Sequence, residues 1–142
     1  MNLRNLIVFP VVAILTACAS EGSPRLNDRP IHDRYMDYAG APITSVNNLT
    51  RFDGWHAVGR DKLILWGGLN EAYLLTLESS CLNLDTANRI ALTSSVGATV
   101  QVGFDYVRYR DFTGRRERCR ITEIRPVDYK RMQADIKAAK QH

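Results

Sequence analysis

The chain has 142 residues, of which 45% are hydrophobic and 24% are charged. This length accommodates one ordinary domain and excludes a multidomain enzyme, and the composition excludes a purely disordered chain. The 19 basic and 15 acidic residues give a formal net charge of +4. That excess is too small and too dispersed to indicate nucleic-acid binding by itself. The 3 cysteines are an odd number, so at least one of them has a role other than pairing within the chain.

Residues 1–17 have the pattern of an export signal. Arg4 and the amino terminus supply positive charge, and an apolar run follows from Leu6 to Leu15. Ten residues in a helix span only about 15 Å, roughly half of the hydrocarbon core of a bilayer, and Pro10 interrupts the run. We therefore expect a signal peptide over residues 1–17 and no permanent transmembrane helix there.

The end of this segment, Leu15-Thr16-Ala17-Cys18, resembles the lipobox of bacterial lipoproteins. The resemblance implies cleavage between Ala17 and Cys18, a diacylglyceryl group on the Cys18 thiol and an acyl chain on the new amine. Two or more acyl chains anchor a protein stably, whereas a single chain binds marginally. Ala19 follows, in place of the aspartate associated with inner-membrane retention in enteric bacteria, so the resemblance implies an outer-membrane anchor facing the periplasm. The alternative is an ordinary secretory signal that precedes a cysteine by chance.

The next segment, residues 18–42, is rich in Ser, Gly, Pro, Asp and Arg and has no sustained apolar period. This composition predicts a flexible tether behind the lipidated N-terminus. Tyr35, Met36 and Tyr38 are exceptions, because they can dock on the domain as an extra strand or a short turn; a mobile linker with sparse aromatic residues is the alternative. We expect the globular domain over residues 43–142.

Short strand signals separated by turn residues dominate this domain. Residues 55–58 and 63–66 flank the polar stretch 59–62, which predicts a hairpin, and residues 73–77 and 90–92 predict two more strands. Such spacing indicates a mainly β (α+β) fold, a small antiparallel meander that closes as a barrel or a sandwich.

The most regular alternation lies over residues 100–106. It predicts one continuous strand with an apolar face and a partly polar face that meets solvent or lines a cleft. The apolar positions are Val100, Val102, Phe104 and Tyr106, and the opposite positions are Gln101, Gly103 and Asp105.

The last element is predicted to be an amphipathic helix over residues 129–140. Asp128 is a suitable N-cap, and Tyr129, Met132 and Ile136 recur at spacings of three and four. This helix therefore has one apolar stripe to bury against the strands.

If Cys18 carries the lipid, Cys81 and Cys119 are the remaining cysteines and can form a disulfide in an oxidising compartment. A disulfide between them stabilises the domain by roughly 4 kcal/mol on the chain-entropy model. A redox pair is the alternative, although the C-x-x-C spacing is missing. A metal site that adds His56 is another, and it needs a fourth ligand that the sequence does not indicate. We expect no metal and no cofactor.

Candidate catalytic chemistry is sparse, and we assign no catalytic residue. His32 lies in the predicted tether and His142 at the C-terminus, so His56 is the histidine within the domain. No nucleophile elbow, glycine-rich phosphate loop or zinc spacing accompanies His56. We interpret Asp53 to His56 as a turn that leads into a strand.

One cluster of charged residues lies between positions 108 and 120, where the sequence has six arginines and two acidic residues. Arginine forks suit phosphate and carboxylate, so an anionic envelope component such as lipopolysaccharide, cardiolipin or peptidoglycan is a candidate ligand. The alternative is a solvated strand edge whose charges prevent aggregation. The candidate anion-binding residues are Arg108, Arg110, Arg115, Arg116, Arg118 and Arg120.

The chain resembles an uncharacterised family of small proteobacterial lipoproteins with a domain of unknown function. The features that carry the resemblance are the lipobox, the Trp-rich first hairpin and the segments AYLLTLESSCLNL and RCRITEIRPVDYKRM. The resemblance covers residues 45 to 133 and includes Cys81 and Cys119 at the positions of paired cysteines, but it implies no activity or ligand.

Our leading functional hypothesis is a lipid-anchored, non-enzymatic envelope lipoprotein that binds an envelope component or a protein partner from the periplasmic side. The alternatives are a small periplasmic hydrolase that uses His56 and an accessory subunit of an envelope complex. The expected compartment argues against a nucleic-acid partner.

Overall fold

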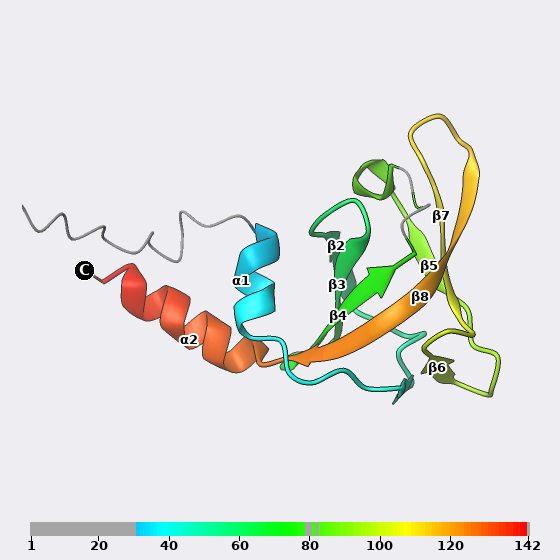
Figure 1. Ribbon diagram of the computed structural model, residues 1–142. Coiled ribbons are helices and arrows are strands. Elements are labelled where there is room, and N and C mark those ends of the chain that lie inside the picture. The colour runs from blue at the N-terminus through cyan, green and yellow to red at the C-terminus, as the bar shows by residue number, and fades with distance from the viewer. Residues whose placement is uncertain (1–30, 79–80, 82, 142) are drawn as a thin grey trace, which may run out of the picture.

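The computed structural model describes residues 31–78, 81 and 83–141 (Figure 1). The expected signal peptide, its cleavage site at Ala17 and Cys18, the lipidated Cys18 and residues 19–30 of the tether lie outside these residues. The described elements in chain order are α1 (Ile31–Asp37), β1 (Ser45–Asn47), β2 (Gly54–Ala57), β3 (Lys62–Gly68), β4 (Glu71–Leu77), the 3-10 turn η1 (Leu84–Thr86), β5 (Ile90–Leu92), β6 (Thr99–Gln101), β7 (Tyr106–Arg110), β8 (Arg116–Val127) and α2 (Tyr129–Ala139).

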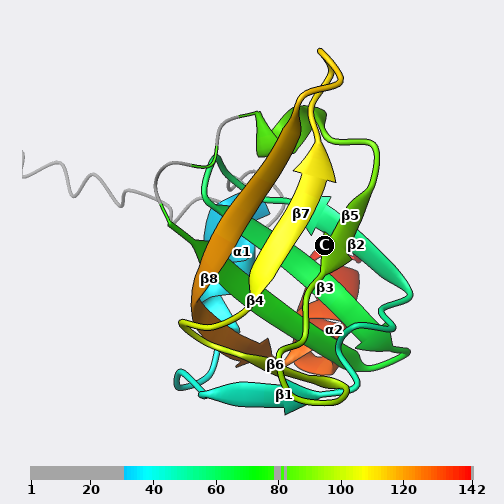
Figure 2. The same cartoon turned by 90° about the vertical axis from the view of Figure 1, so that its right-hand side faces the viewer.

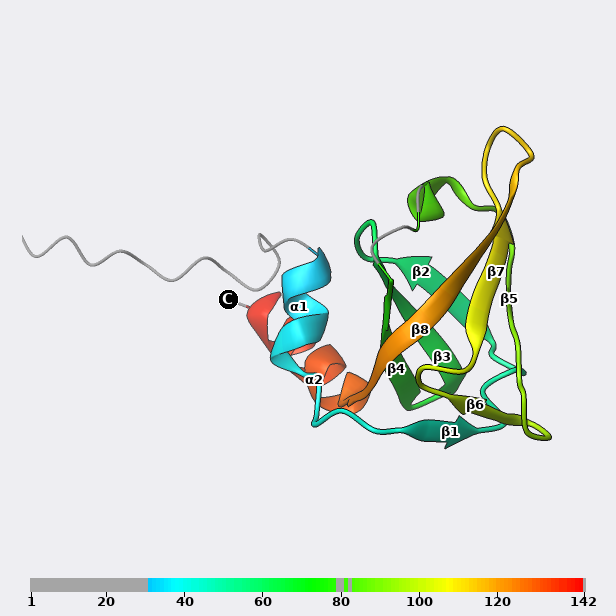
Figure 3. The same ribbon diagram turned by 45° about the vertical axis from the view of Figure 1, so that its right-hand side comes forward.

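The fold is mainly β, as the strand pattern predicts. Six antiparallel strands form one sheet in the order β2-β3-β4-β8-β7-β5, and this sheet curves into a half-barrel. The two-stranded sheet of β1 and β6 lies across one end of the half-barrel, whereas α1 and α2 pack side by side outside it (Figures 2 and 3). The predicted hairpin at 59–62 is confirmed by the pairing of β2 with β3.

The first core fills the concave side of the curved sheet. It takes alternate residues from the strands, such as Leu63 and Leu65 of β3 and Leu75 of β4. The disulfide between Cys81 and Cys119 is present and buried in this core, with 5.7 Å between the Cα atoms. It joins the segment after β4 to β8, so it braces the side of the half-barrel where β4 and β8 pair.

A second core lies on the opposite side of β3 and β4, beneath the two helices. Ile64 and Leu74 point away from the first core and pack with Tyr35 of α1 and Met132 of α2. Both faces of these two strands are therefore buried, which explains their nearly continuous apolar sequences. The Asp128 carboxylate accepts a hydrogen bond from the Arg131 backbone N–H at 3.0 Å, and so acts as the predicted N-cap of α2.

The segment 31–42 differs from the flexible tether that its composition predicts. Tyr35 is only 9% exposed and belongs to the second core. Backbone hydrogen bonds also fix the chain that follows α1, since the Gly40 N–H donates to the Pro126 carbonyl at 2.7 Å and the Ile43 N–H donates to the Ile124 carbonyl at 2.9 Å. The folded part of the chain thus begins before residue 43. The apolar surface that holds Tyr35 comes from β3, β4 and α2, which no local pattern around residue 35 reveals.

The prediction of one continuous strand over residues 100–106 is wrong. β6 ends at Gln101 and β7 begins at Tyr106. A turn separates them, in which Gly103 has φ +82° and the buried Asp105 carboxylate accepts a hydrogen bond from the Gln101 N–H at 2.8 Å. The side chain of Asp105 therefore stabilises a turn and does not line a cleft.

Among the described residues, no helix is long and apolar enough to cross a bilayer.

Candidate anion-binding face

The register of the β7–β8 hairpin brings the predicted arginine cluster onto one surface. Arg108 lies opposite Arg118, and Arg110 lies opposite Arg116. Residues directly opposite each other in an antiparallel pair project to the same side of the sheet. Val107, at the alternate position, is buried in the first core. These four arginines therefore project from the convex side of the half-barrel, where all four are exposed.

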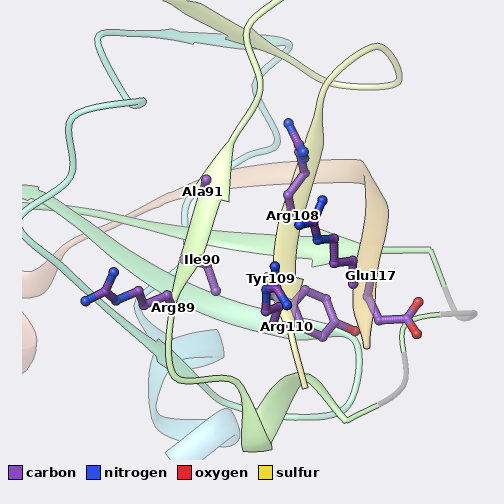
Figure 4. A pocket seen from close by; sticks show the side chains of 8 residues that line it. Arg89, Ile90, Ala91, Arg108, Tyr109, Arg110 and Glu117 are labelled. Carbon is purple, nitrogen blue, oxygen red and sulfur yellow. The ribbon is translucent and has the colours of Figure 1, made fainter. Parts of the chain in front are cut away.

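Arg120 extends this surface along β8, and Arg89 extends it toward β5. Arg120 is the register partner of Tyr106 and lies at the same alternation as Arg118. Arg89 directly precedes β5 and lines one open hollow of about 490 Å³ together with Arg108 and Arg110 (Figure 4). The sequence interpretation missed Arg89, because it is 19 positions from the nearest arginine of the cluster and joins it through β5–β7 pairing. We call this surface the arginine face and define it by Arg89, Arg108, Arg110, Arg116, Arg118 and Arg120.

Arg115 does not belong to the arginine face, although the sequence includes it in the cluster. Its Nε atom pairs with the Glu117 carboxylate at 2.8 Å. Glu117 is the register partner of Tyr109, so its side chain lies at the alternation opposite to Arg116 and Arg118, although Glu117 also lines the hollow with Arg89 and Arg108. Arg115 is thus already neutralised by a neighbour.

The six arginines of the arginine face lack such neutralisation. In the described part of the chain, Arg115, Arg125 and Arg131 pair with carboxylates, and no such pair involves the arginine face. Like charges directly opposite each other in a sheet are destabilising. Two such pairs, Arg108 with Arg118 and Arg110 with Arg116, are therefore retained in β7 and β8 at a cost in folding stability.

Tyr106 orders part of this surface. The Arg118 guanidinium carbon lies 4.1 Å from the centroid of the Tyr106 ring, and that of Arg120 lies 5.6 Å from it. Arg120 also donates a hydrogen bond from Nη2 to the Tyr106 hydroxyl at 3.2 Å. Stacking on an aromatic ring leaves the edges of a guanidinium group free to donate hydrogen bonds. The ring thus holds two cations in place while their donors remain available to a ligand.

The acidic residue at the tip of the hairpin, Asp111, is used within the turn. Its carboxylate accepts hydrogen bonds from the Thr113 hydroxyl at 2.6 Å, the Thr113 N–H at 2.9 Å and the Arg115 N–H at 3.0 Å. The hydrogen bond from the Thr113 side chain is the largest of the effects that lower the pKa of Asp111. The Asp111 carboxylate therefore accepts hydrogen bonds from backbone and hydroxyl donors of the turn and does not pair with an arginine of the described residues.

The other candidate residues do not converge on the arginine face. His56 is exposed on the edge strand β2 and lines a separate hollow with Trp55 and Asp85. Within the described residues, no hydrogen bond or ion pair orients its imidazole. Cys81 and Cys119 are bonded to each other, so neither sulfur is a free thiol for redox exchange or metal binding.

A comparison with protein families identifies the family of this chain. A family of unknown function, DUF6491, matches residues 1–142. The chain belongs to the DUF6491 family. The match is wider than the stretch 45–133 that carries the resemblance in the sequence, and it includes the N-terminal segment of this DUF6491 protein. No curated protein and no solved structure is significantly similar to it.

Proposed function

We propose that this protein is a lipid-anchored, periplasm-facing lipoprotein of the bacterial envelope, and that its arginine face binds an anionic envelope component without catalysis. The observation that carries the proposal is the set of six guanidinium groups on one convex surface, none of them paired with a carboxylate of the described residues. Guanidinium groups bind phosphate and carboxylate in a bidentate manner, so an anionic ligand satisfies both their charge and their geometry.

The position of Arg108 in the sheet supports binding over protection of a strand edge. Charged residues commonly protect edge strands from pairing with other chains. Arg108 pairs with Ala91 of β5 on one side and with Arg118 of β8 on the other, so it does not lie at an edge. Arg116 and Arg118 precede the part of β8 that pairs with β4, residues 121–127, so protection of an edge accounts for those two residues as well as binding does.

The membrane anchor is the second part of the proposal and depends on Cys18. Replacement of Cys18 by Ser removes the thiol that lipidation requires, so the Cys18→Ser protein should leave the membrane fraction of fractionated cells. Unmodified mass of the mature protein, or continued membrane association of Cys18→Ser, would count against lipidation. Separation of inner and outer membranes on a density gradient tests the expected outer-membrane location.

Binding is tested with two triple variants that change the net charge equally. Arg108→Gln/Arg116→Gln/Arg118→Gln removes half of the arginine face, whereas Arg51→Gln/Arg60→Gln/Arg131→Gln removes three exposed arginines elsewhere. The full chain in neutral detergent is tested against peptidoglycan sacculi, immobilised lipopolysaccharide and phosphatidylglycerol nanodiscs.

The wild-type protein should bind at least one of these three probes. The arginine-face variant should bind it at least tenfold more weakly, because each basic residue near an anionic surface contributes about 1 kcal/mol. The control variant should stay within about twofold of the wild type by the same reasoning, since its charges lie off the face. Equal losses in both variants, or no binding of the wild type to any probe, would overturn the proposal.

A further inference from the structure

The turn that joins β7 to β8 presents an unburied aromatic side chain at the tip of the hairpin. Residues 111–115 project beyond the rest of the half-barrel (Figures 1 and 2). Phe112 lies in this turn and is 70% exposed. Transfer of an exposed aromatic side chain from water into an apolar medium is favourable, so a partner that buries this ring gains free energy.

Hydrogen bonds order the backbone of the turn. The Asp111 carboxylate accepts hydrogen bonds from the Thr113 and Arg115 N–H groups, and the Gly114 N–H donates to the Asp111 carbonyl at 3.0 Å. Gly114 has φ +82°, a conformation that residues with a side chain rarely adopt. The backbone that carries Phe112 is thus ordered before any partner arrives, which reduces the backbone entropy lost on binding.

Cations lie directly behind this ring. Phe112 lines a hollow of about 330 Å³ with Arg89 and Arg110, two members of the arginine face. Arg116 begins β8 at the base of the same turn, opposite Arg110. An apolar tip followed by a belt of cations matches the order of layers in an anionic lipid surface, in which phosphates lie above the boundary with the acyl chains.

We infer that the tip of the β7–β8 hairpin docks on an anionic lipid surface, with Phe112 at the boundary between headgroups and acyl chains and with Arg89, Arg110 and Arg116 on lipid phosphates. This inference rests on the proposed function and names the source of the anion. A soluble phosphate or an anionic polysaccharide engages the arginines equally well but leaves Phe112 in water.

Phe104 supplies a matched control for Phe112. It is 69% exposed and precedes β7, whereas Phe112 follows β7, so the two rings lie at opposite ends of the same strand. The full chain carrying either Phe112→Trp or Phe104→Trp is reconstituted into vesicles whose lipids are brominated on the acyl chains. The fluorescence of the wild-type protein, from Trp55 and Trp66, provides the background.

In vesicles that contain phosphatidylglycerol, bromine should quench the fluorescence of a Trp at position 112 and leave a Trp at position 104 unchanged. The quenching should disappear in vesicles of phosphatidylcholine alone and in high salt, which screens the attraction to the surface. Added Arg110→Gln and Arg116→Gln should weaken the contact by about fivefold each, the factor that corresponds to about 1 kcal/mol per charge.

Equal quenching at positions 104 and 112, or no quenching at position 112 in anionic vesicles, would overturn the inference. If position 112 stays unquenched while the arginine-face variant still loses binding to sacculi or lipopolysaccharide, the inference fails and the proposed function stands. If the arginine-face variant also behaves like its control on every probe, both fail.

Discussion

Arg108 and Arg118 are direct register partners on β7 and β8, so two positive charges face each other on the same side of the sheet. Arg118 is stacked on Tyr106, and Arg108 has no carboxylate partner among the described residues. Cross-strand pairs of like charge reduce stability, and pairs of unlike or neutral side chains do not. This arrangement is unfavourable for folding alone and becomes favourable when an anion lies between the two guanidinium groups.

Replacement of Arg108 by Thr should therefore increase stability in the absence of a ligand. We expect the free energy of unfolding at low ionic strength to rise by about 0.5 kcal/mol, because one repulsive cross-strand pair is removed and Thr suits a strand. Urea denaturation at low and high salt measures this effect, and high salt should reduce the gain. Arg60→Thr, in the exposed turn between β2 and β3, is the control. A loss of stability in Arg108→Thr would show that the charge pair is not repulsive in the folded protein.

The disulfide should account for a large share of the stability of this small domain. Cys81 and Cys119 are separated by 38 residues and both are buried. The double variant Cys81→Ala/Cys119→Ala should lose roughly 4 kcal/mol of unfolding free energy, since the unfolded chain gains the entropy that the bridge removes. Denaturant unfolding with and without reductant measures the loss, and Cys18→Ser should unfold like the wild type. A double variant as stable as the wild type would contradict a structural role of the bridge.

Docking of α1 should be measurable through Tyr35. The side chain of Tyr35 lies in the second core, next to Met132 of α2. Tyr35→Ala should reduce the free energy of unfolding by about 3 kcal/mol, the usual cost of removing a buried aromatic side chain. Met36→Ala removes a side chain that is 38% exposed and should cost much less. Similar unfolding curves for both variants would indicate that residues 31–37 are not docked in solution.

Tyr109 should make the domain sensitive to strongly alkaline pH. Burial is the main effect that raises the pKa of Tyr109 from 10.0 to about 12, with Glu117 and Asp111 contributing in the same direction. A raised pKa means that the neutral phenol stabilises the fold. This contribution is complete below pH 10 and is lost as the pH rises toward 12, because the unfolded chain releases the proton first.

The pKa values of Tyr35, Tyr38 and Tyr73 are raised by burial as well, so ultraviolet titration should show several tyrosines that ionise late in the wild-type protein. Tyr109→Phe should remove the latest of these steps. The Tyr109→Phe protein should also lose less stability between pH 10 and pH 12 than the wild type. Identical alkaline titration curves for both proteins would contradict the burial of this hydroxyl.

Local patterns in the sequence determined most of the secondary structure. The hairpin at 59–62, the strand at 90–92 and the helix capped by Asp128 depend on turn residues, alternation and capping, which act over a few positions. The pairing of Cys81 with Cys119 follows from counting once Cys18 is set aside. The prediction of one strand over residues 100–106 was wrong for an equally local reason. The alternation continues through a turn, which the Asp105 side chain closes by hydrogen bonding.

The membership of the arginine face was decided by the tertiary structure. Arginines at 108, 110, 116 and 118 share one surface because the turn at 111–115 sets the register of β7 and β8, and a shift by one residue moves one strand's arginines to the other side. Arg89 belongs to the arginine face because β5 pairs with β7, whereas Arg115 is excluded because it pairs with Glu117. The sequence by itself determined that positive charge is concentrated in this hairpin. Only long-range strand pairing determined which charges meet, because register depends on hydrogen bonds between segments that are distant in the chain.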